Sequence, residues 1–205
     1  MADYDYFDRD SEMVSILGLA EVDIHHYRLL LLLLLNFPAS FAFILVNRVL
    51  QVSVTVRHAI SFTLGFGSLL WLVPLHSGIE LLATSLVIYA LARQRSVSVH
   101  PFVILAATLA QLIYTDWRYG RKGQYAVLAG IQMMALIKWS FFYNDAKDGV
   151  LLGKAARSSS SFPSPTAYLG FMFFFPCVAV GPAYRFLEYN AVIQNSFIMP
   201  GKVSE

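Results

Sequence analysis

Apolar residues along this chain gather into long runs, and polar residues separate one run from the next. A helix that crosses the roughly 30 Å hydrocarbon core of a bilayer needs about 20 apolar residues. The candidate runs are residues 27–46, 59–73, 79–91, 101–114, 125–143 and 168–180. This pattern predicts an all-α protein, a polytopic transmembrane helical bundle of about six spans.

The second and third runs are short and close together. Pro74 ends the second run, and His76–Gly78 is expected to form a tight turn into the third. The pair is therefore expected to form a tilted hairpin or a partly re-entrant segment. Ser61 and Gly65 lie four residues apart and offer a face of small side chains that another helix can approach closely.

Polar side chains interrupt two of the other runs. Asn36 and Pro38 lie within the first run, so a bend is expected there. Gln132 lies centrally in the fifth run and is expected to hydrogen-bond another helix. Lys138 is a functional candidate by its position, but it also lies about one turn from the end of that run. Snorkelling to the interface or a structural pairing is the favoured interpretation of Lys138.

Aromatic and basic residues mark the ends of several runs. Tryptophan and tyrosine concentrate at membrane interfaces, and basic loops favour the cytoplasmic side. The expected interfacial aromatics are Tyr114, Trp117, Tyr119, Trp139 and Tyr143. If six spans alternate, one side receives Arg48, Arg57, Arg93, Arg95, Lys147, Lys154 and Arg157, and the other receives Arg118, Arg121 and Lys122. This distribution favours a luminal N-terminus.

Composition agrees with a membrane protein. Apolar residues make up 57% of the chain and charged residues 14%, whereas a soluble domain carries about 25% charged residues. The net charge of +2 is too small to imply a nucleic-acid partner. The single cysteine, Cys177, excludes an intramolecular disulfide and a multi-cysteine zinc site, and it is expected to face lipid or the protein core.

The whole chain, residues 1–205, is expected to form one membrane-embedded region. Residues 1–25 are interpreted as an acidic tail that ends in an interfacial segment, Met13–Leu19, and not as a secretory signal. Transmembrane helices are expected over residues 26–190, followed by a C-terminal tail over 191–205. Within the helical part, residues 144–166 form the longest polar connection and include a serine tract, so an exposed loop is expected there.

The sixth run carries two proline breaks. It reads Phe173, Phe174, Phe175 and Pro176, and then Gly181 and Pro182. Each proline removes a helical hydrogen bond and pushes the preceding residue out of the helical region. Freed backbone groups are tolerated at membrane depth only where protein buries them or where they line a cavity. The run therefore predicts a crowded interior or a substrate tunnel, with a simple proline kink as the alternative.

The histidines lie at the edges of the runs, so interfacial polar roles are expected for them. They are His25, His26, His58, His76 and His100. None belongs to a recognisable metal-ligand cluster, and no phosphate-binding loop or nucleophile elbow is present. No metal site is therefore predicted, and no cofactor.

The motifs of the sixth run resemble those of the membrane-bound O-acyltransferase (MBOAT) family, in its lysophospholipid acyltransferase branch. The residues that carry this resemblance are Pro163, Ser164, Tyr168, Gly170, Phe173 to Pro176, Gly181, Pro182, Ala183, Tyr184 and Tyr189. Gln132, Met133 and Lys138 resemble an upstream stretch of the same branch, as do Gly18, Leu19, the leucine-rich first run, Arg57 and His58. The resemblance covers most of the chain.

The resemblance implies acyl transfer from acyl-CoA, as co-substrate, to a lysophospholipid in a multi-pass protein of the endoplasmic reticulum membrane. Membrane lipids are then the expected partners. The family fold surrounds a tunnel, for which the wall candidates are Lys138, Phe173, Phe174, Phe175, Pro176, Gly181 and Pro182. No histidine follows His100, and Asn190 and Asn195 do not fit the family pattern. No catalytic residue is therefore assigned, and this chain is expected to lack the catalytic half.

Three interpretations of the whole chain follow. The first is a truncated or alternatively spliced product of a lysophospholipid acyltransferase. The second is a non-enzymatic membrane protein that binds lipid or associates with a full-length acyltransferase. The third, ranked last, is a small transporter, which only the broken helix suggests because no inverted repeat is visible.

Overall fold

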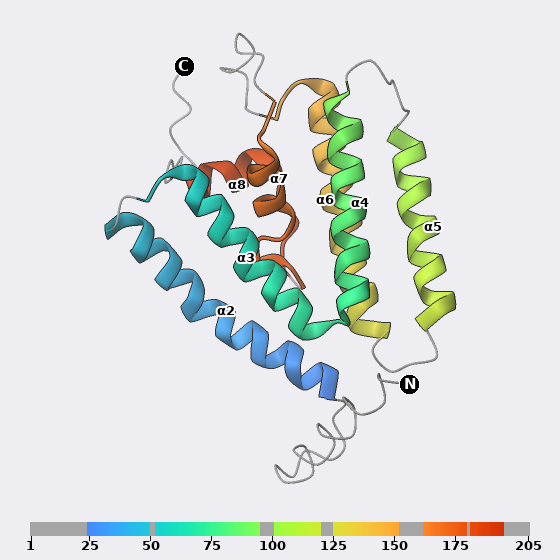
Figure 1. Cartoon of the computed structure of the whole chain (residues 1–205), viewed down its shortest axis with the longest axis horizontal. Coiled ribbons are helices and arrows are strands. Elements are labelled where there is room, and N and C mark those ends of the chain that lie inside the picture. The colour runs from blue at the N-terminus through green and yellow to red at the C-terminus, as the bar shows by residue number, and fades with distance from the viewer. Residues whose placement is uncertain are drawn as a thin grey trace.

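The described part of the chain is helical. The computed structural model describes residues 24–49, 52–94, 101–119, 125–151, 162–179 and 181–194, and these ranges contain no β-strand (Figure 1). The helices are α2 (Ile24–Val49), α3 (Val54–Leu72), α4 (Leu75–Arg93), α5 (Pro101–Tyr119), α6 (Tyr125–Asp148), α7 (Pro165–Met172), the 3-10 helix η2 (Phe175–Cys177) and α8 (Phe186–Ile193). The predicted all-α class is confirmed for these residues.

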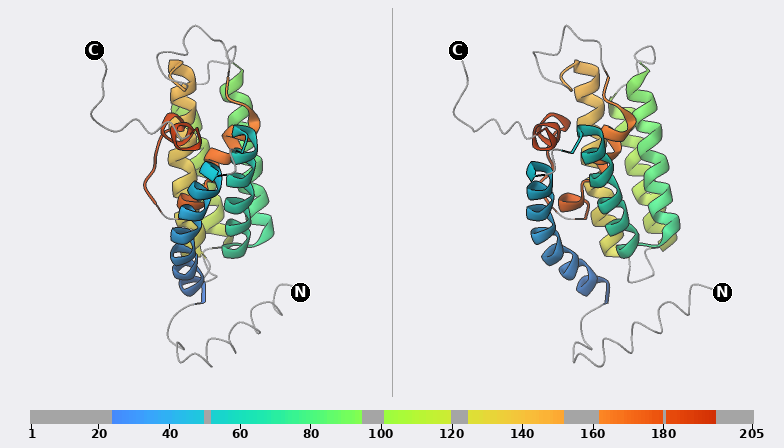
Figure 2. Two further views of the ribbon diagram at one scale, coloured as in Figure 1. Left: turned by 90° about the vertical axis from the view of Figure 1, so that its left-hand side faces the viewer. Right: turned by 60° about the vertical axis from the view of Figure 1, so that its left-hand side comes forward.

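The helices gather into two groups with a broken segment between them (Figures 1 and 2). In one group, α6 packs against both α4 and α5. In the other, α2 lies along α3. The chain from α7 to α8 fills the space between α3 and α6, and it contacts α3 most extensively.

The connection between α3 and α4 is shorter than the sequence indicated. Val73 is extended, and Pro74 stands at the N-cap of α4. A proline cannot continue α3, and it restricts the residue before it to extended conformations. The predicted turn at His76–Gly78 is therefore wrong, because these residues form the first turn of α4.

The small-residue face of α3 is confirmed. The Ser61 hydroxyl donates a hydrogen bond to the Gly170 carbonyl of α7 at 3.0 Å. A Cβ atom added to Gly65 would lie 1.5 Å from the carbonyl oxygen of Phe173. A Cβ atom added to Gly170 would lie 2.4 Å from the Tyr189 hydroxyl and 2.8 Å from the His58 carbonyl oxygen. The glycines thus permit backbone-to-backbone contact between α3 and the broken segment.

Polar side chains join α4, α5 and α6. Gln132 Nε2 donates to Thr115 Oγ1 at 2.9 Å, which confirms the expected interhelical role of Gln132. Thr84 Oγ1 donates to Gln111 Oε1 at 3.1 Å. Hydrogen bonds of this kind hold neighbouring helices together in an apolar medium.

Two of the expected interfacial aromatics are buried. Trp139 is 2% exposed, and its Nε1 donates to Ser85 Oγ at 3.0 Å. Tyr143 is 5% exposed. Their interfacial assignment is wrong, because Trp139 donates a hydrogen bond to α4 and Tyr143 is buried within the protein. Trp117, by contrast, is 81% exposed, as a residue that faces lipid would be.

Two described helices are long and apolar enough to cross a membrane. They are Tyr27–Val46 within α2, with a mean hydropathy of 2.5, and Leu75–Arg93, with a mean hydropathy of 1.5. Large apolar side chains are exposed over most of α2, for example Leu34 and Phe37. These features support a membrane location in general terms, whereas the six spans and the endoplasmic reticulum stay predictions.

The ends of the helices agree with the predicted grouping of basic residues. The first turn of α3 and the last turns of α4 and α6 lie at the same end of the bundle (Figure 1). These turns carry Arg57, Arg93 and Lys147. The membrane side that this end faces stays a prediction.

The polar connection after α6 is shorter than predicted. α6 continues to Asp148, and α7 begins at Pro165, so residues 144–148 and 165–166 are helical. The serine tract, the N-terminal tail with Met13–Leu19 and residues 195–205 lie outside the described residues. The division of the chain into tail, helices and C-terminal tail stays a prediction.

Candidate functional site

The broken segment is the most unusual feature of the fold. Ser164 caps α7 by accepting a hydrogen bond from the Ala167 amide at 3.2 Å. The helix stops at Met172 after 8 residues, and the chain turns into η2 around Pro176. A stretch without helix then leads to α8. The fracture that the sequence predicts for this segment is thus present, and a simple proline kink is excluded.

Lys138 satisfies carbonyl groups that the break frees. Its Nζ atom lies 3.5, 3.1 and 3.3 Å from the carbonyl oxygens of Phe171, Met172 and Cys177. The residue is 1% exposed, so it does not snorkel to an interface. The structural pairing expected for Lys138 is therefore correct, and snorkelling is wrong. A buried ammonium group is tolerated here because it meets three acceptors and lies near the negative end of the α7 dipole.

Asn36 holds the other side of the break. Its Nδ2 atom donates to the Phe175 carbonyl oxygen at 3.0 Å, from the middle of α2. The Phe175 ring packs edge-on against Phe43 of the same helix, with centroids 5.7 Å apart. α2 is continuous through Pro38. The side chain of Asn36, two residues before that proline, is used to hold the neighbouring broken segment.

A small cavity lies beside Lys138. Its free volume is about 10 Å³, which is roughly enough for one water molecule. Its lining residues are Leu69, Leu81, Ser85, Ile131, Met134, Ala135, Lys138, Met172, Phe173 and Val178. An acyl chain does not fit this volume, so a lipid could enter only after the surrounding helices separate.

The predicted tunnel residues fall into three environments. Lys138 and Phe173 line the cavity. Phe175 is buried, and Phe174 and Pro176 are half-buried. Pro182 is exposed, and Gly181 is half-buried with its Cα facing Cys177: an added Cβ would lie 2.8 Å from the Cys177 sulfur. The structure thus gathers these residues on one broken segment and its neighbour α6, and their role as a tunnel wall stays a prediction.

An aromatic cluster packs behind the break, and the sequence did not indicate it as a unit. Its members are Tyr89, Phe142, Phe162, Tyr168, Phe171, Phe186 and Tyr189. Phe142 and Tyr168 are the closest pair, with ring centroids 4.4 Å apart. The spacing of tyrosine and phenylalanine residues over 162–189 was the sequence feature that could have indicated this cluster. The cluster fixes α7 and α8 against α4 and α6.

Two adjacent residues of α3 hold α8 in place. His58 Nδ1 lies 2.9 Å from the Tyr189 hydroxyl, and the histidine is 4% exposed. Arg57 donates to the Ile193 carbonyl oxygen, at the end of α8, at 2.9 Å. The interfacial role expected for His58 is therefore wrong: its side chain is engaged within the protein. His58 and Tyr189 are 131 residues apart in the sequence, so their contact becomes visible only in the folded structure.

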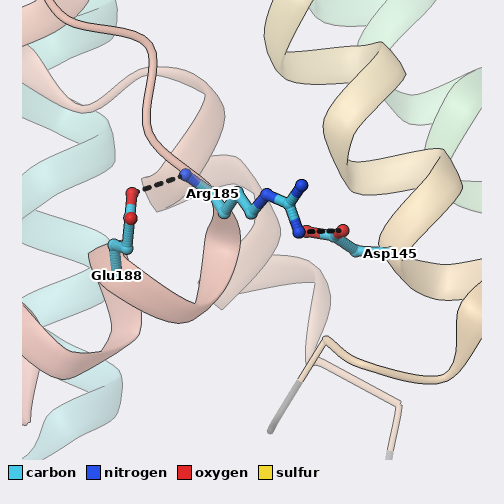
Figure 3. A network of polar contacts seen from close by, with 3 residues as sticks. All are labelled: Asp145, Arg185 and Glu188. Carbon is cyan, nitrogen blue, oxygen red and sulfur yellow. Dashed lines mark hydrogen bonds and ion pairs between the residues drawn. The ribbon is translucent and has the colours of Figure 1, made fainter.

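An ion pair joins the N-cap residue of α8 to the end of α6, and a second polar contact lies within the start of α8 (Figure 3). Arg185 Nη1 lies 3.4 Å from Asp145 Oδ1, and the Glu188 carboxylate accepts from the Arg185 amide at 2.9 Å. Burial raises the pKa of Asp145, and the Arg185 guanidinium opposes that shift. Asp145 lies beyond the apolar run of α6. No group of three metal-ligating side chains occurs in the part of the chain that the structure describes.

Comparison with known proteins gives one informative match. The chain is 26% identical over 176 residues to a lysophospholipid acyltransferase of Schizosaccharomyces pombe. The match covers 82% of this chain but 35% of the fission-yeast protein, so the chain spans about a third of that relative's length. No protein-family model matches the chain. No solved structure matches it significantly.

Proposed function

We propose that this chain forms a membrane-embedded part of an acyl-CoA-dependent lysophospholipid O-acyltransferase of the MBOAT type, which remodels phospholipid acyl chains in the endoplasmic reticulum. The observation that carries this proposal is the match to the S. pombe lysophospholipid acyltransferase over 82% of the chain. The motif residues of the proposed family also support it, because they form one packed unit, the broken segment and its contacts on α3 and α6.

In this proposal, the broken segment holds lipid and does not perform proton transfer. Attack of a lysophospholipid hydroxyl on a thioester requires a general base within hydrogen-bond reach. His58 is paired with Tyr189, and no described histidine adjoins the cavity beside Lys138. In this proposal, the general base lies outside the broken segment and the cavity beside Lys138. The chain would supply apolar walls that accept the acyl chain once the helices around the broken segment separate.

Photolabelling of the intact chain in membranes tests this proposal. The probe is a lysophosphatidylcholine with a diazirine in its acyl chain and an alkyne for detection. We expect labelled peptides from residues 162–194, and competition by both unlabelled lysophosphatidylcholine and long-chain acyl-CoA. Labelling that neither competitor reduces, or labelling equal to that of an unrelated multi-pass protein, would contradict the proposal. Competition by the lysolipid alone would favour the non-enzymatic lipid-binding alternative.

A further inference from the structure

The ammonium group of Lys138 lies in a cage of main-chain oxygens. Three carbonyl oxygens surround Nζ at 3.1–3.5 Å, two from the end of α7 and one from the end of η2. The rings of Phe171 and Tyr184 lie with their centroids 5.8 and 5.5 Å from Nζ. Carbonyl oxygens and aromatic faces are both groups that attract a cation.

Among the described residues, no carboxylate pairs with this charge. The buried acidic side chain of α6, Asp145, lies about two turns further along the helix and pairs with Arg185 at 3.4 Å, and α7 carries no acidic residue. A buried charge without an acidic partner persists only where dipoles replace its hydration shell. The carbonyl groups do so here, since the break ends the regular helical hydrogen bonding of α7. Of the three, the Phe171 carbonyl also accepts from the Phe174 amide at 3.4 Å.

We propose that this cage is a monovalent-cation site whose occupant is the protein's own Lys138 ammonium group. The positive charge, and not the volume of the side chain, keeps the carbonyl groups of α7 and η2 turned toward one point. The ligand class that the cage accepts is therefore ammonium and small alkylammonium ions. This inference concerns the architecture of the break and does not depend on acyltransferase activity.

Shortening the side chain should open the site to an added ion. In a Lys138→Ala variant the lysine stem is absent, and the freed space adjoins the cavity of about 10 Å³. Methylammonium reproduces the lost headgroup with its donors, whereas choline offers the same charge in a larger group without N–H donors. Lys138→Met keeps much of the volume but removes the charge.

The test is thermal unfolding of the purified full chain in detergent. We expect Lys138→Ala and Lys138→Met each to lower the melting temperature by at least about 5 °C. Methylammonium chloride at about 100 mM should restore a clear part of the loss in Lys138→Ala, as a ligand that binds only the folded state does. Choline chloride should not restore it, and methylammonium should not rescue Lys138→Met.

Lys147→Ala is the matched control, because Lys147 is an exposed lysine in the last turn of the same helix. It should unfold like the wild type with or without methylammonium. Limited proteolysis in native membranes gives the same comparison for a variant that survives purification poorly. A Lys138→Met protein as stable as the wild type would overturn the proposal, as would a Lys138→Ala protein that responds equally to methylammonium and choline.

Discussion

At the scale of single residues, small and polar side chains inside apolar runs determine how the helices meet. Gly65 lets the backbone of Phe173 reach α3, and Lys138 and Asn36 satisfy carbonyl groups of the break. The sequence indicated all three positions, because each departs from its apolar surroundings. It could not show which partners they meet, since those partners lie as far as 139 residues away.

The contact at Gly65 gives a sharp prediction. Gly65→Ala would place a Cβ atom 1.5 Å from the Phe173 carbonyl oxygen, so α3 and the break must separate. We expect a loss of at least about 2 kcal/mol in the free energy of unfolding, measured by denaturation in detergent. Gly67→Ala is the control, because nothing lies within 4 Å of an added Cβ there. That variant should match the wild type or gain up to about 1 kcal/mol. Equal stability of the two variants would contradict the close approach of α3.

The pair of His58 and Tyr189 gives a second prediction. Tyr189→Phe removes one partner of a buried hydrogen bond of 2.9 Å. A double-mutant cycle with His58→Ala should show a coupling energy of about 1 kcal/mol. Additive effects of the two substitutions, within the error of chemical denaturation, would mean that the pair contributes nothing to holding α8.

For two other residues, the sequence did not predict the correct environment. Trp139 and His58 lie near the ends of apolar runs, where interfacial roles are common. Both are buried because α4 and α8 cover them, and those contacts arise only in the assembled bundle. Their positions near the ends of the runs therefore predicted an interfacial environment for two side chains that are buried.

At the scale of elements, the apolar pattern predicted which helices form but not their ends. α2, α5 and α6 each extend past the predicted runs, because charged and polar residues continue a helix as readily as apolar ones. The fracture of the sixth run was predictable from Pro176 and Pro182, since proline acts locally. α8 lay in a mixed sequence that gave no clear helical signal.

The tie between α2 and the break can be tested with the native cysteine. Cys177 is the one cysteine of the sequence and is 7% exposed, so it reports on opening of the break. Asn36→Leu removes the donor to the Phe175 carbonyl oxygen. We expect alkylation of Cys177 by N-ethylmaleimide to become severalfold faster, because the local opening free energy falls by roughly 1 kcal/mol.

The control for this experiment is Asn144→Leu, at an exposed position near the end of α6. Its alkylation rate should equal that of the wild type. An Asn36→Leu variant whose Cys177 reacts no faster than the wild type would show that α2 does not hold the break closed.

At the scale of the whole molecule, the bundle leaves much apolar surface exposed. α2 carries large exposed apolar side chains along its length, as a helix in contact with lipid does. The exposed apolar surface of α2 thus agrees with the predicted membrane location. Among the described residues, α2 and α4 are long and apolar enough to cross a membrane, so the six spans stay a prediction.

Topology mapping tests the predicted six spans. Loops that carry an N-glycosylation acceptor are inserted either between residues 120 and 124 or between residues 158 and 161. If the spans alternate and the basic end is cytoplasmic, the first insertion is glycosylated and the second is not. Glycosylation of both insertions, or of the second alone, would contradict the predicted arrangement.

The most direct test of the proposed function is a chimera. The region of the S. pombe lysophospholipid acyltransferase that matches this chain is replaced by the chain, in cells that lack the endogenous activity. Transfer of the acyl group from oleoyl-CoA to lysophosphatidylcholine is then measured in isolated membranes. We expect clear acyl-CoA-dependent transfer, and at least about a tenfold loss when Gly65→Leu forces α3 from the break. A chimera that is present in the membrane at the level of the parent protein yet transfers no acyl group would contradict the account.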